Sequence, residues 1–583
     1  MIMKNKVTTL ISTISIMFSC VFTSCEDMLK TDSDIVIFDE DNKLNSSNDT
    51  IYSVIGVVNL MQKVADKTIL INEMRGDLSI VNKNTSIDLQ DVANFNVQED
   101  NKYNKPYQYY AIINNCNYFI ANADSAYNKN NQSIFAKELG VIKTYRAWAY
   151  FQLANIYGEV PFYTNPILSE SESIKQYPRY NMTDICNYFI DDLLPYKDIN
   201  LPNYGDISGM NSKKFFIPIR LMIGDLCLWA GRYQEAIQNY YEYLTNVNTR
   251  TVIGNSNVSW SGPADDMRLS DSYSPLFSIS NSISFIPMEA SYFNGVRSSL
   301  YDIFNSTTEN KYFYEIDPSN SLIDLSNNQM TCRIYSDQSG NRDTIYFSKI
   351  DTIFNERNYF KYGDLRLHSI LSKSNQNVSE GVNISDVFML NNKWRDSGSG
   401  SSSNSGNRYV SLYTAPIIYL RFAEALNRAG FPESAFAVLK YGLTNDNIRD
   451  YVNSKEVERI GALLNFDNNY FTNNNTIGIH SRGCGDANAD STYVLPFPNY
   501  ELASYEDSVE YLIPLVEDMI FDELALETCF EGLRFPDLMR YSIRRDDNSF
   551  LADKVAGRLG EDLYDHSLYN KLKIRKIWYL PLD

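Results

Sequence analysis

The chain is 583 residues long and carries a formal net charge of −20. This length is enough for more than one typical domain and for a large hydrophobic core. The acidic charge repels phosphate backbones and anionic membrane surfaces, so it argues against nucleic-acid binding.

The first 24 residues have the parts of a secretory signal peptide. Lys4 and Lys6 precede an apolar run at 7–22, and this run is shorter than the roughly 20 residues that a membrane-spanning helix needs. Small residues then lead directly to Cys25, so we expect residues 1–24 to be removed. The segment "TSC" resembles the lipobox of bacterial lipoproteins, which implies a lipid anchor on Cys25. An uncleaved buried helix is the alternative.

Residues 25–48 are acidic and polar, and we expect a tether there. From about Thr50 the helical period begins. The segment "YYAIINNCNYFIANADSAY" (109–127) spaces its apolar residues three and four positions apart, which predicts an amphipathic helix. A longer helix is predicted within 134–163, where Gly158 and Pro161 end it.

Three segments, beginning at Tyr145, Pro218 and Pro416, resemble one another. The last two share a proline, an apolar helix, a turn ("AGRY", "AGFP") and a second helix that opens with "QEA" or "ESA". This pattern is similar to tetratricopeptide units. Each such unit has an apolar face that it cannot bury alone, so stacked units build a curved α-solenoid. The irregular spacing predicts long insertions between the units.

The middle of the chain has a different character. Between Asn246 and about Arg408 the helical period fades, and Ser, Asn, Asp, Gly and aromatic residues dominate. The segments "TCRIYS" and "TIYFSKI" alternate as short strands do, and "RDSGSGSSSNSGN" (395–407) has the composition of a flexible loop. Binding residues concentrate on loops that a rigid scaffold supports, so we expect the ligand site here.

The C-terminal segment 519–547 predicts an amphipathic helix that Pro536 kinks or restarts. The final "KIWYLPLD" predicts a short strand or an extended tail. The cysteines after Cys25 are widely spaced, so neither a zinc site nor a tight disulfide framework is indicated. They are Cys116, Cys186, Cys227, Cys332, Cys484 and Cys529.

Taken together, these segments resemble the SusD/RagB family of outer-membrane lipoproteins from Bacteroidota, over nearly the whole chain after the leader. No single motif is specific to this family, but the order of the motifs along the chain is. The motifs are "SCEDML", "NEMRGD" (72–77), "RAWAYFQLANIYGEVPFY", "IYLRFAEALNRAG", "GIHSRGCGD" (478–486), "ELALETCFEGLRFPDLMR" and "IWYLPL".

The resemblance implies a mostly α fold, with a tetratricopeptide-like α-solenoid lobe, long loop-rich insertions and a few short strands. It divides the chain into four parts. These are a signal peptide at 1–24, a tether at 25–48, an N-terminal SusD-like helical region at 49–245 and a RagB/SusD C-terminal domain at 246–583, which bears the loop-rich ligand face.

The resemblance also implies a function. Family members bind oligosaccharides, or peptides in some relatives, and pass them to a SusC-like TonB-dependent transporter. They are not enzymes, and the resemblance brings neither catalytic residues nor a cofactor to this chain. The pair Glu26 and Asp27 resembles the acidic signal that sends lipoproteins of this phylum to the cell surface. The implied location is the outer membrane, facing the exterior, with membrane contact through the lipid anchor only.

Two sets of charged residues are singled out by the motifs. Arg75 and Asp77 match the E-x-R-x-D stretch of the family. We expect them to fix the following loop through an ion pair or cap, and ligand contact is the alternative. Arg534, Asp537 and Arg540 follow one another at three-residue spacings, which places them on one helical face and predicts helix contacts.

Carbohydrate binding needs flat aromatic side chains against the sugar rings. The 43 Tyr and 30 Phe fit such a surface, and an AT-rich genome would explain them equally well. An exposed loop tryptophan is informative because so much apolar surface is usually kept from water. Trp148 and Trp229 lie on predicted helices and are expected in the core. The platform candidates in polar loops are Trp260, Tyr292, Phe293, Trp394 and Phe95.

Signals for a metal or a reaction are weak. Asp486, Asn488 and Asp490 alternate as a calcium loop begins, but Ser491 and Phe497 stand where the loop needs Gly and Glu. The 3 histidines are too scattered for a zinc or catalytic centre, and no hydrolase, phosphate-loop or metalloprotease motif is present. The rival functions are a surface glycoside hydrolase that uses paired carboxylates and a non-catalytic adhesin or scaffold.

Overall fold

The computed structural model describes residues 47–123, 128–129, 132–133, 135–246, 249, 251–253, 259–261, 268–270, 282–288, 295–305, 314–336, 339–347, 363–374, 388–394, 409–466, 471, 476–485, 492–497 and 504–582. These are called the described residues below. The chain divides into two units, Met1–Asn45 and Ser46–Asp583, and every described residue lies in the second.

The described part is mostly helical, as expected. The helices of the first half are α2 (Ser47–Met74), α3 (Ile87–Ala93), α4 (Pro106–Asn122), α5 (Ala136–Tyr157), α6 (Glu170–Ser173), α7 (Met182–Leu193), α8 (Ile219–Ala230) and α9 (Tyr233–Leu244). Those of the second half are α11 (Leu300–Phe304), α12 (Asn320–Asn327), α13 (Leu365–Ile370), α14 (Ala415–Arg428), α15 (Pro432–Lys440), α16 (Asn445–Tyr451), α17 (Ser454–Ile460), α19 (Tyr505–Thr528), α20 (Arg534–Arg545), α21 (Asn548–Ala556) and α22 (His566–Leu572).

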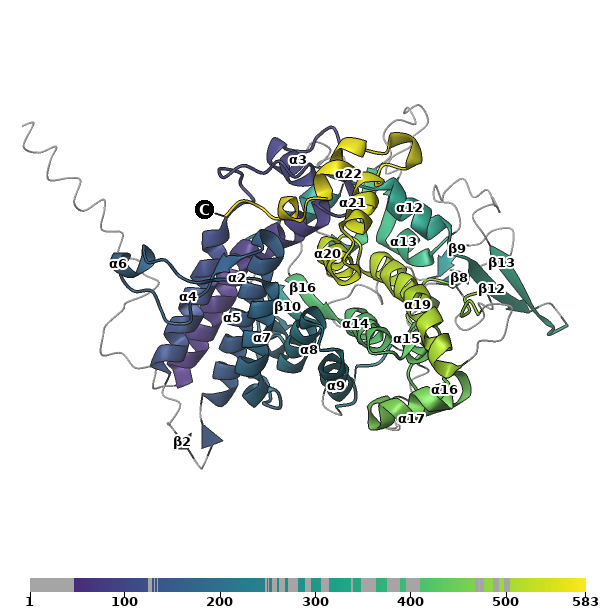
Figure 1. The fold of residues 1–583 in the computed structure, drawn as a ribbon, viewed down its shortest axis with the longest axis horizontal. Helices are drawn as coiled ribbons and strands as arrows, with labels where there is room; N and C mark the ends of the chain where they lie inside the picture. Colours follow the sequence, from purple (N-terminus) through teal and green to yellow (C-terminus); the bar gives the residue numbers. More distant parts are fainter. Residues whose placement is uncertain are drawn as a thin grey trace, which may run out of the picture. The chain divides into compact units, whose positions relative to one another are not determined.

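Helices α2, α4, α5, α7, α8 and α9 form a layered stack in which each packs against the next (Figure 1). The stack is the predicted solenoid. Helix α5 is buried on nearly every side from Leu139 to Tyr157, because α2, α4, α7 and α8 all contact it. Trp148 lies in this core as expected, whereas Trp229 is only partly buried.

The pair α8 and α9 shows why the sequence pattern predicts a helix–turn–helix unit. Gly231 ends α8 in the left-handed conformation, with φ of 77°, which glycine adopts without steric cost. An ideal Cβ at Gly224 would lie 2.6 Å from a ring carbon of Tyr240. A side chain at Gly224 would therefore separate the two helices.

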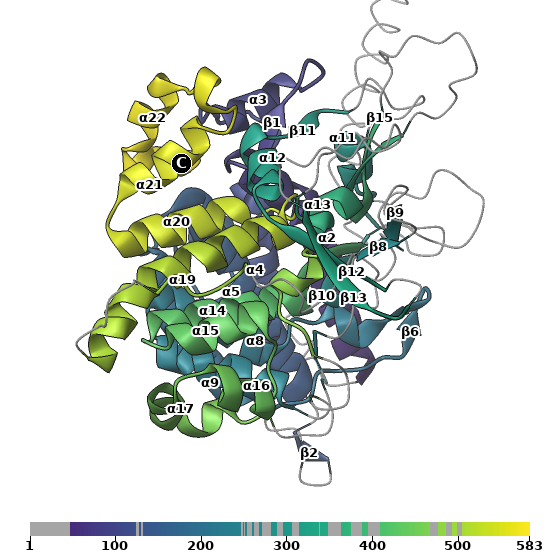
Figure 2. The same ribbon diagram turned by 90° about the vertical axis from the view of Figure 1, so that its right-hand side faces the viewer.

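The solenoid resumes after the long middle region. Helix α14 packs against α9, α15 and α19, although residues 245–414 separate it from α9 in the chain (Figure 2). The six-residue strand β10 (Ser282–Pro287) pairs with β16 (Tyr409–Thr414), which runs directly into α14. The segment between these two strands, 288–408, is thus an insertion that this ladder closes.

Strands are short and occur as antiparallel pairs among the described residues. The two predicted strands are confirmed as β12 (Thr331–Ser336) and β13 (Arg342–Phe347), which pair with each other. The other pairs are β1 (Ser79–Val81) with β11 (Ile316–Pro318), β2 (Asn128–Lys129) with β3 (Gln132–Ser133), β4 (Val160–Pro161) with β5 (Arg179–Tyr180), β6 (Asp206–Ile207) with β7 (Met210–Asn211), β8 (Ser259–Ser261) with β9 (Arg268–Ser270), and β14 (Leu371–Ser374) with β15 (Phe388–Asn391).

The C-terminal helices differ in part from the prediction. Segment 519–547 is two helices, α19 and α20, and Pro536 lies in the first turn of α20, the second of the two expected arrangements.

The C-terminal tail is not a strand. It forms a 3-10 turn (Arg575–Trp578) and then extends, so that the Leu580 N–H donates a hydrogen bond to the Ile156 carbonyl at 2.9 Å. The buried Trp578 anchors it.

The six cysteines of the described part are buried. Cys116 and Cys186 lie on the buried faces of α4 and α7. Burial raises the pKa of the Cys116 thiol to about 12, so it stays protonated at neutral pH. These thiols pack as small apolar side chains.

Glu456 caps α15 from a neighbouring helix, α17. Its carboxylate accepts the backbone N–H groups of Ser434 at 2.6 Å and Glu433 at 3.3 Å, and the side chain is fully buried. Burial raises the pKa of Glu456 to about 7, even though the hydrogen bonds from Ser434 oppose the rise. The carboxyl therefore favours its neutral form in the folded chain.

Replacing Glu456 with glutamine should change how stability depends on pH. Because the folded pKa lies above the ordinary 4.5, the stabilisation from Glu456 is full below that value and is lost as pH rises to about 7. Between about pH 4 and pH 8, the free energy of unfolding of Glu456→Gln should gain roughly 3 kcal/mol relative to wild type. Urea titrations along a pH series measure this. The exposed Glu458→Gln is the control, and parallel curves for Glu456→Gln and wild type would contradict the prediction.

Candidate functional site

A cleft of about 650 Å³ opens between α2, the residues just before and at the start of α4, and the segment 295–305. One face of α2 supplies several of its residues at spacings of four, as the helical period requires. The lining consists of Gln62, Lys63, Asp66, Lys67, Leu70, Lys102, Tyr103, Gln108, Val296, Arg297, Ser299, Asp302, Ile303 and Glu315.

Gln62 ties the far wall of the cleft to α2. Its amide nitrogen donates to the Pro287 carbonyl at 2.7 Å, and its amide oxygen accepts the N–H of Val296 at 3.2 Å. An ideal Cβ at Gly295 would lie 2.3 Å from the same amide oxygen, so a side chain there would displace the Gln62 amide.

Asp66 lies one turn further along α2 and fixes the same wall. Its carboxylate accepts the hydroxyl of Ser298 at 2.9 Å, and the N–H and hydroxyl of Ser299 at 2.6 and 2.9 Å. Burial raises the pKa of Asp66 even though these hydrogen bonds oppose the rise. The hydrogen bonds of this carboxyl group thus hold Ser298 and Ser299 against α2.

The third wall comes from the loop before α4. The Lys102 ammonium lies 4.9 Å from the centre of the Tyr103 ring and donates to the Ser86 hydroxyl at 3.3 Å. Glu315 accepts the N–H and hydroxyl of Ser86 at 2.8 and 2.7 Å. Burial, and then the charge of Glu315, raise the pKa of Tyr103, so its phenol stays neutral and can donate or accept hydrogen bonds.

Lys67 lies between the α2 and α4 sides of the cleft. Its ammonium donates to the side-chain oxygen of Gln108 at 2.6 Å. Burial, and then the nearby charge of Lys105, lower the pKa of Lys67, while Asp66 acts in the opposite direction. An anionic group placed in the cleft would relieve this unfavourable environment.

The lining combines amides, ammonium groups, a guanidinium, carboxylates and a phenol on a wall that hydrogen bonds keep in place. Such convergent donors and acceptors suit the binding of a polar ligand. A second, smaller cleft of about 480 Å³ lies beside the start of α8. Its Arg220 is in ion pairs with Asp198 and Glu242, so the larger cleft is the stronger candidate.

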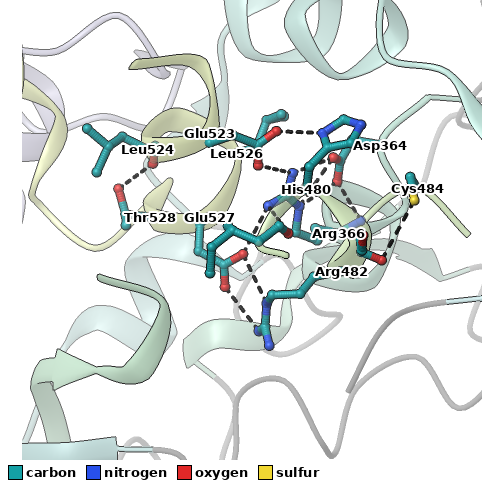
Figure 3. Close-up of polar contacts among 12 residues, drawn as sticks. Asp364, Arg366, His480, Arg482, Cys484, Glu523, Leu524, Leu526, Glu527 and Thr528 are labelled. Carbon is teal, nitrogen blue, oxygen red and sulfur yellow. Dashed lines mark hydrogen bonds and ion pairs between the residues drawn. The ribbon is translucent and has the colours of Figure 1, made fainter. Parts of the chain in front are cut away.

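A buried network of charges joins the insertion to α19 (Figure 3). At its centre, Arg366 contacts Asp364 at 2.6 Å, Glu523 at 2.8 Å and Glu527 at 3.1 Å. Arg482 contacts Glu527 at 3.0 Å, and the Nδ1 atom of His480 lies 2.6 Å from Glu523. These six side chains come from α13 with the residue before it, the 478–485 segment and α19, and all are buried.

Within this network, burial alone would raise the pKa of Glu523. The charge of Arg366, followed by that of His480, instead lowers it to about 2. Gly483 lets Asp364 enter, because an ideal Cβ there would lie 2.3 Å from the Asp364 carboxylate. The motif "GIHSRGCGD" thus has a structural role. The four partners from α13 and α19 had not been predicted, although two acids four residues apart on an apolar helical face were a usable signal.

Arg75 and Asp77 serve the fold in the described structure. The Arg75 guanidinium donates to the Trp578 carbonyl at 2.6 Å and to the Asn72 side chain at 2.8 Å. Asp77 forms a two-point ion pair with Arg534, at 2.7 and 3.0 Å. Arg75 and Asp77 are both buried, so the alternative of direct ligand contact has no support from the structure. Asp77 is thus in an ion pair, as expected, and the residue that it pairs with is Arg534.

The other two residues of the predicted helical face also make buried contacts. Arg540 contacts Glu424 of α14 at 2.6 Å and Asp537 of its own helix at 2.8 Å. All three are buried. The expectation of helix contacts is confirmed.

The platform hypothesis requires rings that are open to solvent, which Trp394 is not and Phe95 is only in part. Trp394 is only 5% exposed and stacks on Phe304, with ring centres 5.8 Å apart. The polar residues next to Trp394 in the sequence suggested that its side chain is exposed. The ring that covers it belongs to Phe304, 90 residues away in the chain, so the local sequence does not reveal the contact. Phe95, at a positive φ of 57°, is partly buried and packs on Phe535 at 5.6 Å.

The remaining candidates are not tested by the structure. Cys25, Tyr292 and Phe293 lie outside the described residues, as do the calcium candidates Asp486, Asn488 and Asp490. Trp260 is in β8, but its side chain is outside the described part. Among the described residues, no cluster of His, Cys, Asp or Glu could bind a metal ion, and no helix there has the length and apolarity to span a membrane.

A scan of the chain against protein-family models finds no match, and a search of the curated proteins finds no relative. Solved structures match over most of the chain. A SusD-like carbohydrate-binding protein from Bacteroides fragilis is 13% identical and has a TM-score of 0.56, with 87% of this chain and 88% of that chain covered. A SusD-superfamily protein from Bacteroides vulgatus is 14% identical, with a TM-score of 0.55 and coverages of 92% and 95%. Surface glycan-binding protein A from Bacteroides fluxus is 12% identical, with a TM-score of 0.52 and coverages of 90% and 94%.

Proposed function

We propose that this chain, which has the SusD-like fold, is a non-catalytic protein of the SusD/RagB type that binds oligosaccharides at the cell surface. The observation that carries the proposal is the match of nearly the whole chain to structures named as SusD-like carbohydrate-binding and surface glycan-binding proteins. Fold alone does not establish a ligand, so the cleft beside α2 supplies the second support.

The chemistry of the cleft suits a carbohydrate. Sugar hydroxyls both donate and accept hydrogen bonds, and Gln108, Lys67 and Tyr103 offer both kinds of partner within one cleft. The volume of about 650 Å³ is in the range of sites that enclose a small ligand. Trp260, Tyr292 and Phe293 remain proposed as aromatic platforms for the sugar rings. Peptides are the alternative ligand.

We further propose that the chain is a lipoprotein of the outer membrane, anchored through Cys25 and facing the exterior. The sequence of the leader and the acidic Glu26 and Asp27 support this location. The bound oligosaccharide would pass to a SusC-like TonB-dependent transporter. Isolating the chain from detergent-solubilised outer membranes tests this partnership, because a β-barrel transporter should be isolated with it.

Binding and hydrolysis can be separated in one experiment. Purified protein lacking residues 1–24 is incubated with a panel of neutral and acidic oligosaccharides, and both retention and released products are measured. We expect retention of at least one oligosaccharide without products. Released products would support the rival glycoside hydrolase, and a chain that retains no saccharide would contradict the proposal.

Substituting the untested aromatic residues should weaken this binding. Trp260→Ala and Phe293→Ala should each lower affinity for the retained oligosaccharide about tenfold or more, because a lost stacking contact costs roughly 1–3 kcal/mol. Isothermal titration calorimetry measures the affinity. The partly buried Trp229 supplies Trp229→Phe as a control on a solenoid helix, and unchanged affinity in both platform variants would remove them from the site.

A further inference from the structure

The cleft beside α2 differs in charge from the chain taken as a whole. The whole chain carries −20, whereas the cleft lining has four cationic side chains against three carboxyl groups. The cationic groups come from three separate elements, since Lys63 and Lys67 lie on α2, Lys102 precedes α4, and Arg297 is in the 295–305 segment. Positive charge is therefore present on every wall.

The carboxyl groups of the lining are engaged by the protein, and two of them have partners in the cleft walls. Asp66 accepts three hydrogen bonds from Ser298 and Ser299, at 2.6–2.9 Å. Glu315 accepts two from Ser86, at 2.7 and 2.8 Å. These acids fix the walls, so less of their charge is directed at a ligand. Asp302 is the third acid of the lining.

The cationic groups of the lining lie where a ligand in the cleft could contact them. Lys67 lies partly buried against the neutral amide of Gln108, at 2.6 Å, and Lys63 lies one helical turn before it on the same face of α2. Lys63 and Arg297 are exposed at the cleft. A ligand that enters from solvent would meet these two charges first and reach Lys67 between the α2 and α4 walls.

We propose that the cleft binds an acidic saccharide, whose carboxylate or sulfate group lies against Lys63, Lys67 and Arg297. This inference rests on the proposed function, because it names the class of glycan that the same site takes. Hydrogen bonds from ammonium and guanidinium groups to an anionic oxygen are about twice as strong as neutral ones. They also distinguish an acidic sugar from a neutral sugar of the same shape.

The test uses the protein without residues 1–24 and two pairs of probes. One pair is oligogalacturonate and its methyl ester, which isolates the carboxylate. The other is a sulfated galactan oligosaccharide and its desulfated form, which isolates the sulfate. Wild type should bind one acidic probe at least about tenfold more tightly than its neutral counterpart, and added salt should weaken the binding.

The variant Lys63→Gln/Arg297→Gln should lose about tenfold or more of the affinity for that acidic probe and clearly less of the affinity for the neutral probe. Both residues are exposed, so the fold should be unaffected, and matched thermal melts check this. The control Lys83→Gln/Lys137→Gln removes the same charge at exposed positions outside the cleft lining.

Each outcome has a distinct meaning. Equal binding of the acidic and neutral probes, or unchanged affinity in the Lys63→Gln/Arg297→Gln variant, would overturn the inference and leave the proposed function intact. Loss of affinity equal to that of the control variant would also overturn it, because a general charge effect would then suffice. Retention of no saccharide, acidic or neutral, would overturn both.

Discussion

Replacing Arg366 with methionine should lower the free energy of unfolding by about 3–5 kcal/mol. Arg366 contacts Asp364, Glu523 and Glu527 in the buried network, and methionine has a similar length without the charge. Removing one partner of a buried ion pair leaves an uncompensated charge away from water. Here one substitution removes the shared partner of three carboxylates, so the effect should reach the upper end of that range.

Chemical denaturation of wild type and variant measures the change. Arg449→Ala is the control, because Arg449 also contacts two acids, Asp446 and Asp450, but is largely exposed. It should change stability by less than about 1 kcal/mol. A loss in Arg366→Met no larger than in Arg449→Ala would mean that the network contributes little to stability.

A double-mutant cycle shows whether the cost arises from unpaired charge. Adding Glu523→Gln to Arg366→Met neutralises one of the stranded carboxylates. The double variant should therefore be more stable than the sum of the two single losses implies, by about 1–3 kcal/mol. Simple additivity would indicate that lost packing, and not charge, explains the effect of Arg366→Met.

Replacing Asp77 with alanine should cost about 3–5 kcal/mol. Burial alone would raise the pKa of Asp77, but the charge of Arg534 lowers it below the ordinary value, which shows that the ionised pair is favoured. Alanine leaves the buried Arg534 guanidinium without this carboxylate, 3.7 Å from the centre of the Phe521 ring. The pair joins the residues just after α2 to the start of α20, so its loss weakens the contact between these two segments.

The matched control for Asp77→Ala is Glu235→Ala. Arg232 and Glu235 form the same two-point contact, with both distances at 2.6 Å, but at partly exposed positions. Glu235→Ala should cost less than about 1 kcal/mol because water screens the exposed pair. Denaturant midpoints measure both losses. Similar losses in the two variants would show that geometry alone, without burial, determines the value of such pairs.

Much of the helical architecture could be predicted from local patterns. The α8–α9 and α14–α15 pairs were predicted from their turns, and β12 and β13 from alternation. These signals lie within 30 residues or fewer of one another, so they need no knowledge of distant contacts. The amphipathic helix predicted within 109–127 is α4, which ends at Asn122.

The candidate site was less accessible to such reasoning. Polar neighbours suggested that Trp394 is exposed, but Phe304 covers its ring. The cleft itself joins α2 to the 295–305 segment through Gln62, whose partner Val296 is 234 residues away. Nothing in either local sequence identifies the other, so the charge of the cleft could not be read before the fold was known.

The sequence by itself determined the helical repeats and the order of motifs that resembles the SusD/RagB family, and it predicts a lipoprotein-like leader. These features depend on backbone geometry and short spacings, which are local. Only the tertiary structure decided which charges are buried together, such as Asp77 with Arg534 across 457 residues, and which charges line an open cleft. The physical reason is that burial and ion pairing depend on how distant segments approach one another, and that approach minimises the free energy of the whole chain.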